Sequence, residues 1–163
     1  MNTELSHVDP QGHPRMVDVS GKTPSLRRAR ARCEMELPTA TSMHLRDRGW
    51  RVGKGPVVDT AIIAATQAVK RTHELIPFCH PLPLESCTVS IHFIGDDLLA
   101  IECEVIAHAR TGVEMEALTG TTIAALTIYD MCKALGQGMR IRDIRVVSKS
   151  GGSHDFNEVT ACP

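Results

Sequence analysis

The sequence predicts a single α+β domain, a ferredoxin-like sandwich in which helices pack on one face of a mainly antiparallel, four-stranded sheet. Three observations lead to this fold class. Four segments alternate apolar and polar residues, as strands with one buried face do. Together with three expected helices, they follow the order strand, helix, helix, strand, strand, helix, strand. A chain of 163 residues is long enough for one such domain and short for two.

The four expected strands cover residues 32–37, 86–94, 98–109 and 139–150. Pro38 closes the first strand, because proline cannot donate a hydrogen bond to a strand ladder. Between the second and third strands, Gly95-Asp96-Asp97 is typical of a hairpin turn. We therefore expect these two strands to pair directly.

The three expected helices cover residues 39–48, 57–76 and 114 to about 135. The second is rich in alanine and follows Pro56, a residue that a first helical turn tolerates. The third is stopped by Gly136 and Gly138. Residues 77–84 contain three prolines, so we expect this connection to be irregular.

Both ends of the expected domain, residues 1–163, differ in composition from its middle. Residues 1–30 are rich in His, Pro, Gly and Arg and show little periodicity, which favours an extended arm. Residues 150–163 include a Gly-Gly pair and favour a mobile tail.

Composition argues against several classes of protein. The formal net charge is −1, and the basic stretch at residues 26–33 is too short for a general nucleic-acid surface. The first residues do not resemble a secretory signal, and no apolar run approaches a membrane span. Six cysteines without a CxxC pattern favour reduced thiols. We expect a cytoplasmic protein with neither a nucleic-acid nor a membrane partner.

Asp130 and Lys133 are charged residues near the end of an otherwise apolar helix pattern. One interpretation is an ordinary ion pair three residues apart on a solvated helix face. The alternative is a functional pair, because the neighbouring residues leave little room for a solvated face. The pattern alone leaves both interpretations open.

A distance argument concerns the two ends of this helix. Glu116 and Asp130 are fourteen residues apart, which corresponds to roughly 21 Å along a helix axis. One compact site in a single chain could not easily use both. Either one of them is structural, or two copies of the helix run antiparallel across a twofold axis and share a site.

Other candidates have both a functional and an ordinary interpretation. Glu114 and Glu116 could act chemically or simply complement the helix dipole. His80, held between Cys79 and Pro81, could be catalytic or structural, and no His/Cys spacing resembles a zinc site.

Three lysines are candidates for contacts with a ligand. Lys54 lies between two glycines, where the backbone can approach a ligand closely, although the P-loop pattern is absent. Lys70 ends the second helix and Lys149 ends the last strand. Each could equally be a solvated side chain.

Several blocks of the sequence together resemble a known family. They are MVDVS (16–20), KRTHELIPFCHPLPL (70–84), TGVEMEALT (111–119), AALTIYDMCKAL (124–135) and KSGG (149–152). In this order they resemble the cyclic pyranopterin monophosphate synthase family of molybdenum cofactor biosynthesis. The resemblance runs from about His7 to Phe156.

The resemblance implies a fold, an activity and an assembly. The family has a ferredoxin-like fold and converts (8S)-3′,8-cyclo-7,8-dihydroguanosine 5′-triphosphate to cyclic pyranopterin monophosphate, releasing pyrophosphate. We expect no protein-bound cofactor, because lysines could neutralise the departing pyrophosphate without a fixed metal, although a loosely held Mg²⁺ could accompany the phosphates. Its assembly is a homohexamer, a trimer of dimers with active sites at the dimer interfaces.

The resemblance also assigns residues. The family's catalytic aspartate falls on Asp130 and its motif lysine on Lys133. Further candidates, carried over from the family or added to it, would contact the substrate or neutralise its charge: Lys54, Phe78, Cys79, His80, Glu114, Met115, Glu116 and Lys149. Arg27 and Lys70 are lesser candidates for phosphate ligands. Two departures matter: Pro56 replaces an aspartate after Lys54-Gly55, and the tail SGGSHDF (150–156) lacks one residue and a basic side chain.

Two rival functions fit parts of the pattern. One is a non-catalytic module that binds a nucleotide or senses a metabolite, and the other is a metal-dependent hydrolase built on His80 and the carboxylates. The two departures also allow a diverged relative with the family fold and reduced activity.

Overall fold

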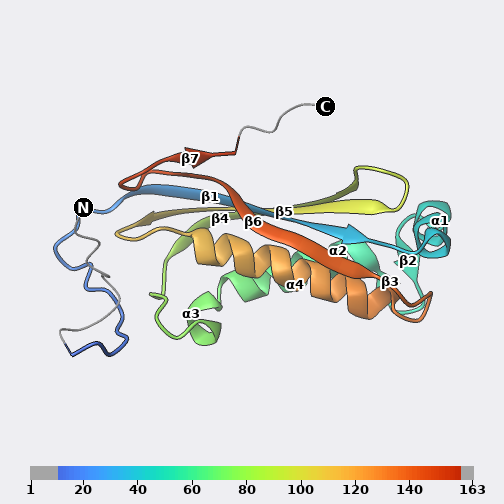
Figure 1. The fold of residues 1–163 in the computed structure, drawn as a ribbon, viewed down its shortest axis with the longest axis horizontal. Coiled ribbons are helices and arrows are strands. Elements are labelled where there is room, and N and C mark those ends of the chain that lie inside the picture. The colour runs from blue at the N-terminus through green and yellow to red at the C-terminus, as the bar shows by residue number, and fades with distance from the viewer. Residues whose placement is uncertain (1–10, 159–163) are drawn as a thin grey trace.

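A sheet and a layer of helices make up the computed structural model, which describes residues 11–158 (Figure 1). The strands are β1 (Ser25–Glu36), β2 (Arg51–Val52), β3 (Gly55–Pro56), β4 (Leu84–Phe93), β5 (Leu98–Ala109), β6 (Arg140–Ser150) and β7 (Phe156–Asn157). The helices are α1 (Thr39–Asp47), α2 (Val57–Val69), α3 (Thr72–Leu75) and α4 (Glu114–Cys132). An α+β architecture with an antiparallel sheet is therefore confirmed.

The main sheet has five strands in the order β4-β5-β1-β6-β7, so the expectation of four was wrong. All its neighbouring strands run antiparallel. The fifth strand exists because the chain turns back after β6 at Gly151, whose φ is +85°, and Phe156 then pairs with Lys149. A Cβ at Gly151 would collide with the carbonyl of Leu26, which explains the need for glycine there. Strands β2 and β3 form a separate small hairpin.

Strand β1 begins at Ser25, well before the expected start at Arg32. It pairs with β5 along its whole length, from Ser25 opposite Ala109 to Glu36 opposite Leu98. The early part alternates small buried residues with arginines that face the uncovered side of the sheet. The basic stretch at residues 26–33 is thus part of the central strand of the sheet, and residues 25–30 do not belong to an extended arm.

The expected helix over residues 57–76 is two helices, α2 and α3. Lys70 and Arg71 form the break between them, and the Thr72 hydroxyl donates a hydrogen bond to the carbonyl of Val69 at 3.1 Å. The third expected helix is confirmed as α4, which ends slightly earlier, at Cys132. Within residues 11–158 no helix has the length and apolar content needed to cross a membrane.

Helices α2 and α4 pack against each other and against one face of the sheet, which is the lower face in Figure 1. Small residues let α4 approach the sheet closely, with Ala117, Ala124 and Ala125 fully buried. Gly120 allows the tightest contact: an added Cβ would lie 2.6 Å from both Cys103 Sγ and Val69 Cγ2. The height of α4 above the sheet therefore depends on glycine at this position.

Replacing Gly120 with valine should lower the free energy of unfolding by about 2 kcal/mol or more, because overpacking forces α4 away from β5 and α2. Urea unfolding followed by circular dichroism measures this change. Gln67→Val, at an exposed position of α2, controls for the helix propensity of valine. Equal stability of the two variants would contradict the close contact.

Candidate active site

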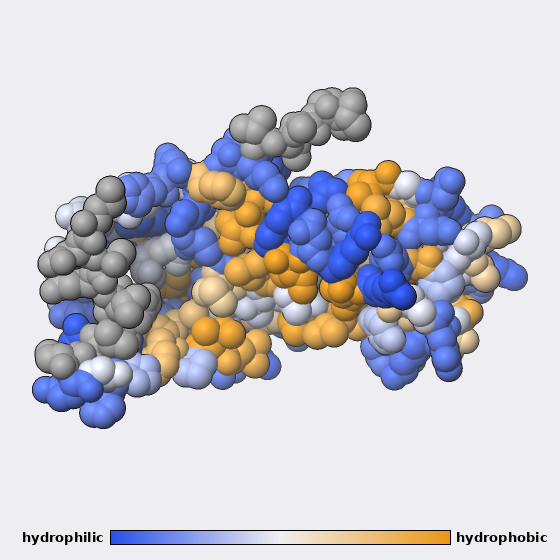
Figure 2. Space-filling view, in the orientation of Figure 1, coloured by the Kyte–Doolittle hydropathy of each residue, from blue (hydrophilic) through white to orange (hydrophobic). Residues whose placement is uncertain are grey.

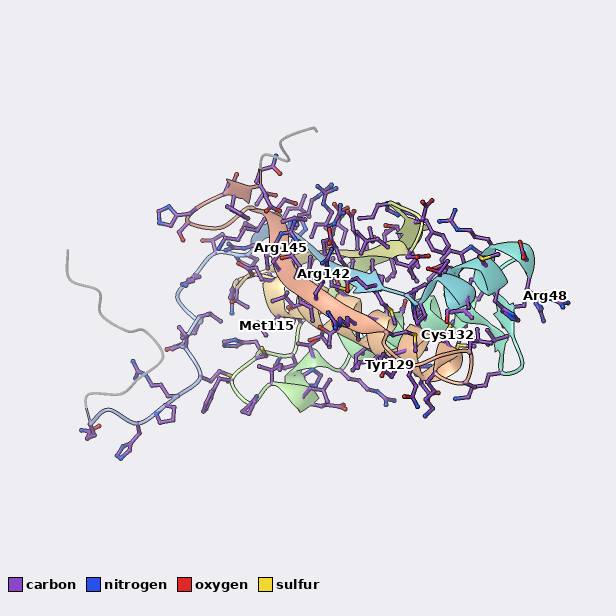
Figure 3. The ribbon with its side chains drawn as sticks, turned by 45° about the vertical axis from the view of Figure 1, so that its right-hand side comes forward. Arg48, Met115, Tyr129, Cys132, Arg142 and Arg145 are labelled. Carbon is purple, nitrogen blue, oxygen red and sulfur yellow. The ribbon has the colours of Figure 1, made fainter. Side chains whose placement is uncertain are left out.

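The candidate residues gather at the two ends of helix α4. Figure 3 marks these ends by Met115, near the beginning of the helix, and Tyr129, near its end. Asp130 and Lys133 belong to the second end, and Glu114 and Glu116 to the first. Each end forms its own cluster with residues from distant parts of the chain.

At the C-terminal end, Asp130 accepts hydrogen bonds from two lysines. Lys133 Nζ lies 2.8 Å from Oδ1, and Lys54 Nζ lies 2.7 Å from Oδ2. Lys54 also donates to the backbone carbonyl of Asp130 at 2.9 Å. The pair inside the helix exists, but the simple interpretation as an intrahelical pair is incomplete, because a lysine 76 residues away in sequence joins it.

This cluster carries a surplus of positive charge and is open to solvent. Hydrogen bonds from Lys133 and Lys54 lower the pKa of Asp130 to about 2, and Asp130 raises the pKa of Lys133. Asp130 and Lys133 are therefore both charged at neutral pH. About half of each of the three side chains is exposed, so an incoming anion could reach both ammonium groups.

Lys54 reaches Asp130 from the tip of the β2–β3 hairpin, which lies beside the end of α4 in Figure 1. Gly53 and Lys54 form the turn of this hairpin, and Gly55, with a φ of +120°, begins β3 directly after it. Pro56, the first departure from the family pattern, pairs with Arg51 and precedes α2.

At the N-terminal end of α4, a pocket of about 240 Å³ brings together six sequence-predicted residues. These are Phe78, Cys79, His80, Glu114, Met115 and Glu116. The Nε2–H of His80 donates a hydrogen bond to the carbonyl of Val17 at 2.9 Å, which joins the N-terminal segment to this pocket. His80 therefore contacts the segment MVDVS (16–20), the first of the blocks that carry the family resemblance.

Glu116 is the buried acid of this pocket, with 4% of its surface exposed. Burial raises its pKa to about 7, and the charge of nearby Glu114 acts in the same direction. Burial also raises the pKa of the Cys79 thiol, as does Glu116. A carboxyl group that gains and loses a proton near neutral pH is suited to proton transfer.

A second pocket, of about 270 Å³, lies next to the first and shares Glu114 with it. Lys149 and Arg27, which the sequence analysis named as candidate phosphate ligands, line it, and Lys149 Nζ lies 3.1 Å from Glu114 Oε1. Further basic residues in its wall were not predicted: Lys22, Arg28, Arg110 and His154. This pocket offers many positive groups to an anion.

The unpredicted residues gave only weak signals in the sequence. Lys22 and Arg110 are single basic residues in connections, and such residues are ordinarily solvated. The shortened tail still contributes Ser153 and His154 to the second pocket. Lys70, in contrast, lines neither pocket and caps the C-terminal end of α2.

Within one chain the two clusters stay apart, since α4 separates them. The described residues contain no group of three or more His, Cys, Asp or Glu side chains that could hold a metal ion. The arrangement thus offers a cluster of exposed lysines at one end of the helix and two adjoining pockets at the other, one lined by basic residues and one containing buried Glu116.

Comparisons with known proteins support one family. The MoaC family model matches residues 16–152, a range that includes both clusters. The chain belongs to the MoaC family. It is 54% identical over 155 residues to the cyclic pyranopterin monophosphate synthase of Xanthomonas oryzae pv. oryzae, covering 95% of this chain and 94% of that protein. The resemblance drawn from the sequence is therefore confirmed.

More distant relatives carry related names. Cyclic pyranopterin monophosphate synthase 3 of Mycobacterium tuberculosis is 52% identical over 148 residues, covering 91% of this chain and 82% of that protein. A molybdenum cofactor biosynthesis bifunctional protein of Synechocystis is 45% identical over 158 residues, covering 94% of this chain but 46% of the longer relative. The family match and these names confirm the expectation of an enzyme.

The protonation of Glu116 should make stability depend on pH. The folded protein holds this proton more tightly than the unfolded chain does, so the free energy of unfolding falls as pH rises from about 4.5 to about 7. Glu116→Gln removes this loss. We expect the difference in the free energy of unfolding, variant minus wild type, to rise by on the order of 3 kcal/mol between pH 4.5 and pH 7. This figure follows from about 1.4 kcal/mol for each unit of pKa shift.

Urea unfolding at several pH values and one protein concentration measures this difference. Glu74→Gln, an exposed site in α3 outside both pockets, controls for the change from Glu to Gln. A difference between Glu116→Gln and wild type that stays flat between pH 4.5 and 7 would contradict the buried, proton-holding carboxyl.

Proposed function

We propose that this chain is a cyclic pyranopterin monophosphate synthase, converting (8S)-3′,8-cyclo-7,8-dihydroguanosine 5′-triphosphate to cyclic pyranopterin monophosphate with release of pyrophosphate. The observation that carries the proposal is the MoaC family match, which spans both clusters of α4. The chemistry of the two clusters supports it, because this reaction needs both neutralised phosphates and repeated proton transfers.

The positive groups suit the triphosphate and the departing pyrophosphate. Lys54 and Lys133 form an exposed cationic pair around one carboxylate, and an anion could take over their hydrogen bonds. Lys149 and Arg27 add positive charge in the pocket at the other end of α4. Charge neutralisation by these groups lowers the barrier to losing pyrophosphate. The proposal needs no resident cofactor, and a Mg²⁺ ion that arrives with the substrate phosphates is compatible with it.

The pocket at the beginning of α4 suits the ring chemistry. Opening one ring and closing another requires acids and bases that exchange protons near neutral pH. Glu116, with a pKa of about 7, can give or take a proton there, and His80 is held in position by its hydrogen bond to Val17. We assign Lys133 the role of an acid near the departing groups, with Asp130 holding it by a hydrogen bond of 2.8 Å.

We further propose that the two clusters meet across a dimer interface. One side of α4 exposes an apolar stripe that includes Met115, Leu126 and Tyr129, and Lys133 lies about five turns after Met115 on the same side. Apolar residues also gather over the middle of the molecule, where α4 lies, on either side of a diagonal run of hydrophilic residues (Figure 2). An antiparallel second copy would bury the stripe and place one chain's Asp130 beside the other chain's Glu116.

Three finer features belong to the same proposal. The four long strands and the helices between them follow the β-α-β-β-α-β order, which supports a ferredoxin-like sandwich. We propose a homohexamer built as a trimer of dimers, with a site at each dimer interface. We also propose that the protein works in the cytoplasm on this nucleotide-derived substrate.

Asp130→Asn and Lys133→Ala should each abolish product formation while leaving the fold intact. Both side chains are about half exposed, so their loss removes the charged cluster without opening the core. The measurement is pyrophosphate release and product formation from the purified substrate, with circular dichroism to check folding. Arg48→Ala, an exposed cation at the end of α1 (Figure 3), serves as a matched control.

Near-normal turnover in either variant would refute the assignment of these residues. Tight binding of the substrate by the wild-type chain without pyrophosphate release would instead favour a binding or sensing module.

A shared site predicts complementation between two inactive variants. Subunits carrying Asp130→Asn and subunits carrying Glu116→Gln should each be inactive alone. A mixed dimer restores one intact site, which takes Glu116 from the first subunit and Asp130 from the second. Random mixing should therefore recover about a quarter of the wild-type activity. Mixing after separate refolding, followed by the pyrophosphate assay, measures this recovery. No recovery from subunits shown to have exchanged would contradict a site that takes Glu116 from one subunit and Asp130 from the other.

A further inference from the structure

We propose that Trp50 is a positioning residue, which holds the β2–β3 hairpin so that Lys54 stays against Asp130. The inference rests on the proposed function, in which Lys54 meets the substrate phosphates. It concerns a residue outside both clusters, at the base of the hairpin rather than at its tip.

Trp50 packs against the end of strand β4. Its ring lies 5.1 Å, centroid to centroid, from the ring of Phe93, the last residue of β4. Arg46 of α1 covers Phe93, with Cζ 3.9 Å from the ring centroid. The same guanidinium donates hydrogen bonds of 2.8 Å to the carbonyls of Gly95 and Asp96 in the β4–β5 turn. Trp50 therefore contacts a ring that is itself held by α1 and by that turn.

The backbone of Trp50 connects this anchor to the hairpin. Its N–H donates to the carbonyl of Leu45 in α1, and its carbonyl accepts from the N–H of Val57 in α2, both at 2.8 Å. These bonds tie the start of the hairpin to α1 and its end to α2. Trp50 has a φ of +61°, a conformation that only surrounding contacts can maintain in a large residue.

Lys54 occupies the tip of this tethered loop, four residues after Trp50. The hairpin ladder itself is short, with two paired positions, Arg51 with Pro56 and Val52 with Gly55. Such a ladder is not stable without outside contacts. Trp50 and Val52 supply them, because both pack against the main core cluster. Loss of the tryptophan ring should let the hairpin move and weaken the contact between Lys54 and Asp130.

The first test reads this contact without any turnover. The carboxyl carbon of Asp130 is followed by NMR during an acid titration of ¹³C-labelled protein, over the range in which circular dichroism shows the fold intact. Lys54→Ala should raise the pKa of Asp130, because one of its two lysine hydrogen bonds is lost. Trp50→Leu should also raise the pKa of Asp130, whereas Trp50→Phe, which keeps an aromatic ring, should leave this pKa at its wild-type value. Combining Trp50→Leu with Lys54→Ala should add nothing to Lys54→Ala alone.

The second test measures the same coupling in catalysis. Trp50→Leu should lower kcat/KM about tenfold or more, as misplacement of a binding group does. The same substitution should have no further effect in a Lys54→Ala background. Phe93→Leu removes the partner ring and leaves Trp50 in place, so it should lower kcat/KM in the same way. This second variant keeps the test available if Trp50→Leu does not fold.

A matched control separates positioning from general loss of stability. Ile91→Ala removes a side chain of β4 that packs against the same core cluster but is outside the Trp50–Phe93–Arg46 contact. It should lower the urea midpoint without moving the Asp130 titration. The inference is overturned if Trp50→Leu and Phe93→Leu leave that titration unchanged while Lys54→Ala shifts it, or if their kinetic effects add fully to that of Lys54→Ala. A wild-type chain that releases no pyrophosphate would sink the proposed function, while the titration would still decide the role of Trp50.

Discussion

The close packing of helix α4 on the sheet is the constraint on which the rest of the structure depends. Gly120 and the buried alanines let the helix pack closely against β5 and α2, so the position of α4 relative to the sheet is fixed. Its nineteen residues span roughly 28 Å, and the two charged clusters are fixed at its ends. A rod of this length keeps the clusters apart within one chain. In the proposed antiparallel dimer, a second copy of the helix would bring the unlike ends together.

The two ends of α4 differ in their electrostatic environment, and this difference divides the chemistry. At the exposed end, solvent and two lysines keep Asp130 ionised. At the other end, burial favours the neutral form of Glu116 and so gives it a proton to exchange near neutral pH. One end is thus suited to binding and neutralising phosphates, and the other to moving protons. A site that joins them has both functions without a large change in either subunit.

The sequence was most informative where periodicity and turn signals agreed. Strand β5 and the start of α4 at Glu114 match the expectations, because alternation and a helix of small apolar residues are strong signals. The early start of β1 was missed, since alanines alternating with arginines show little apolar contrast. The break between α2 and α3 was also missed, because it falls at Lys70 and Arg71 and involves neither glycine nor proline. The site residues came mainly from resemblance, and Lys22 and Arg110 were missed because tertiary folding alone brings them to the pocket.

Pro56 shows why a departure from the family pattern need not disturb the site. The resemblance suggested that losing a carboxylate beside Lys54 would change the geometry of this loop. In the structure, Pro56 stands directly before α2, where the missing N–H of proline costs little, and its carbonyl accepts a hydrogen bond from the Thr60 hydroxyl. The direction of Lys54 follows from Gly55 at the turn and from Trp50 at the base of the hairpin. Because backbone shape and an aromatic anchor hold the lysine, the identity of the side chain at position 56 matters less than the sequence comparison implied.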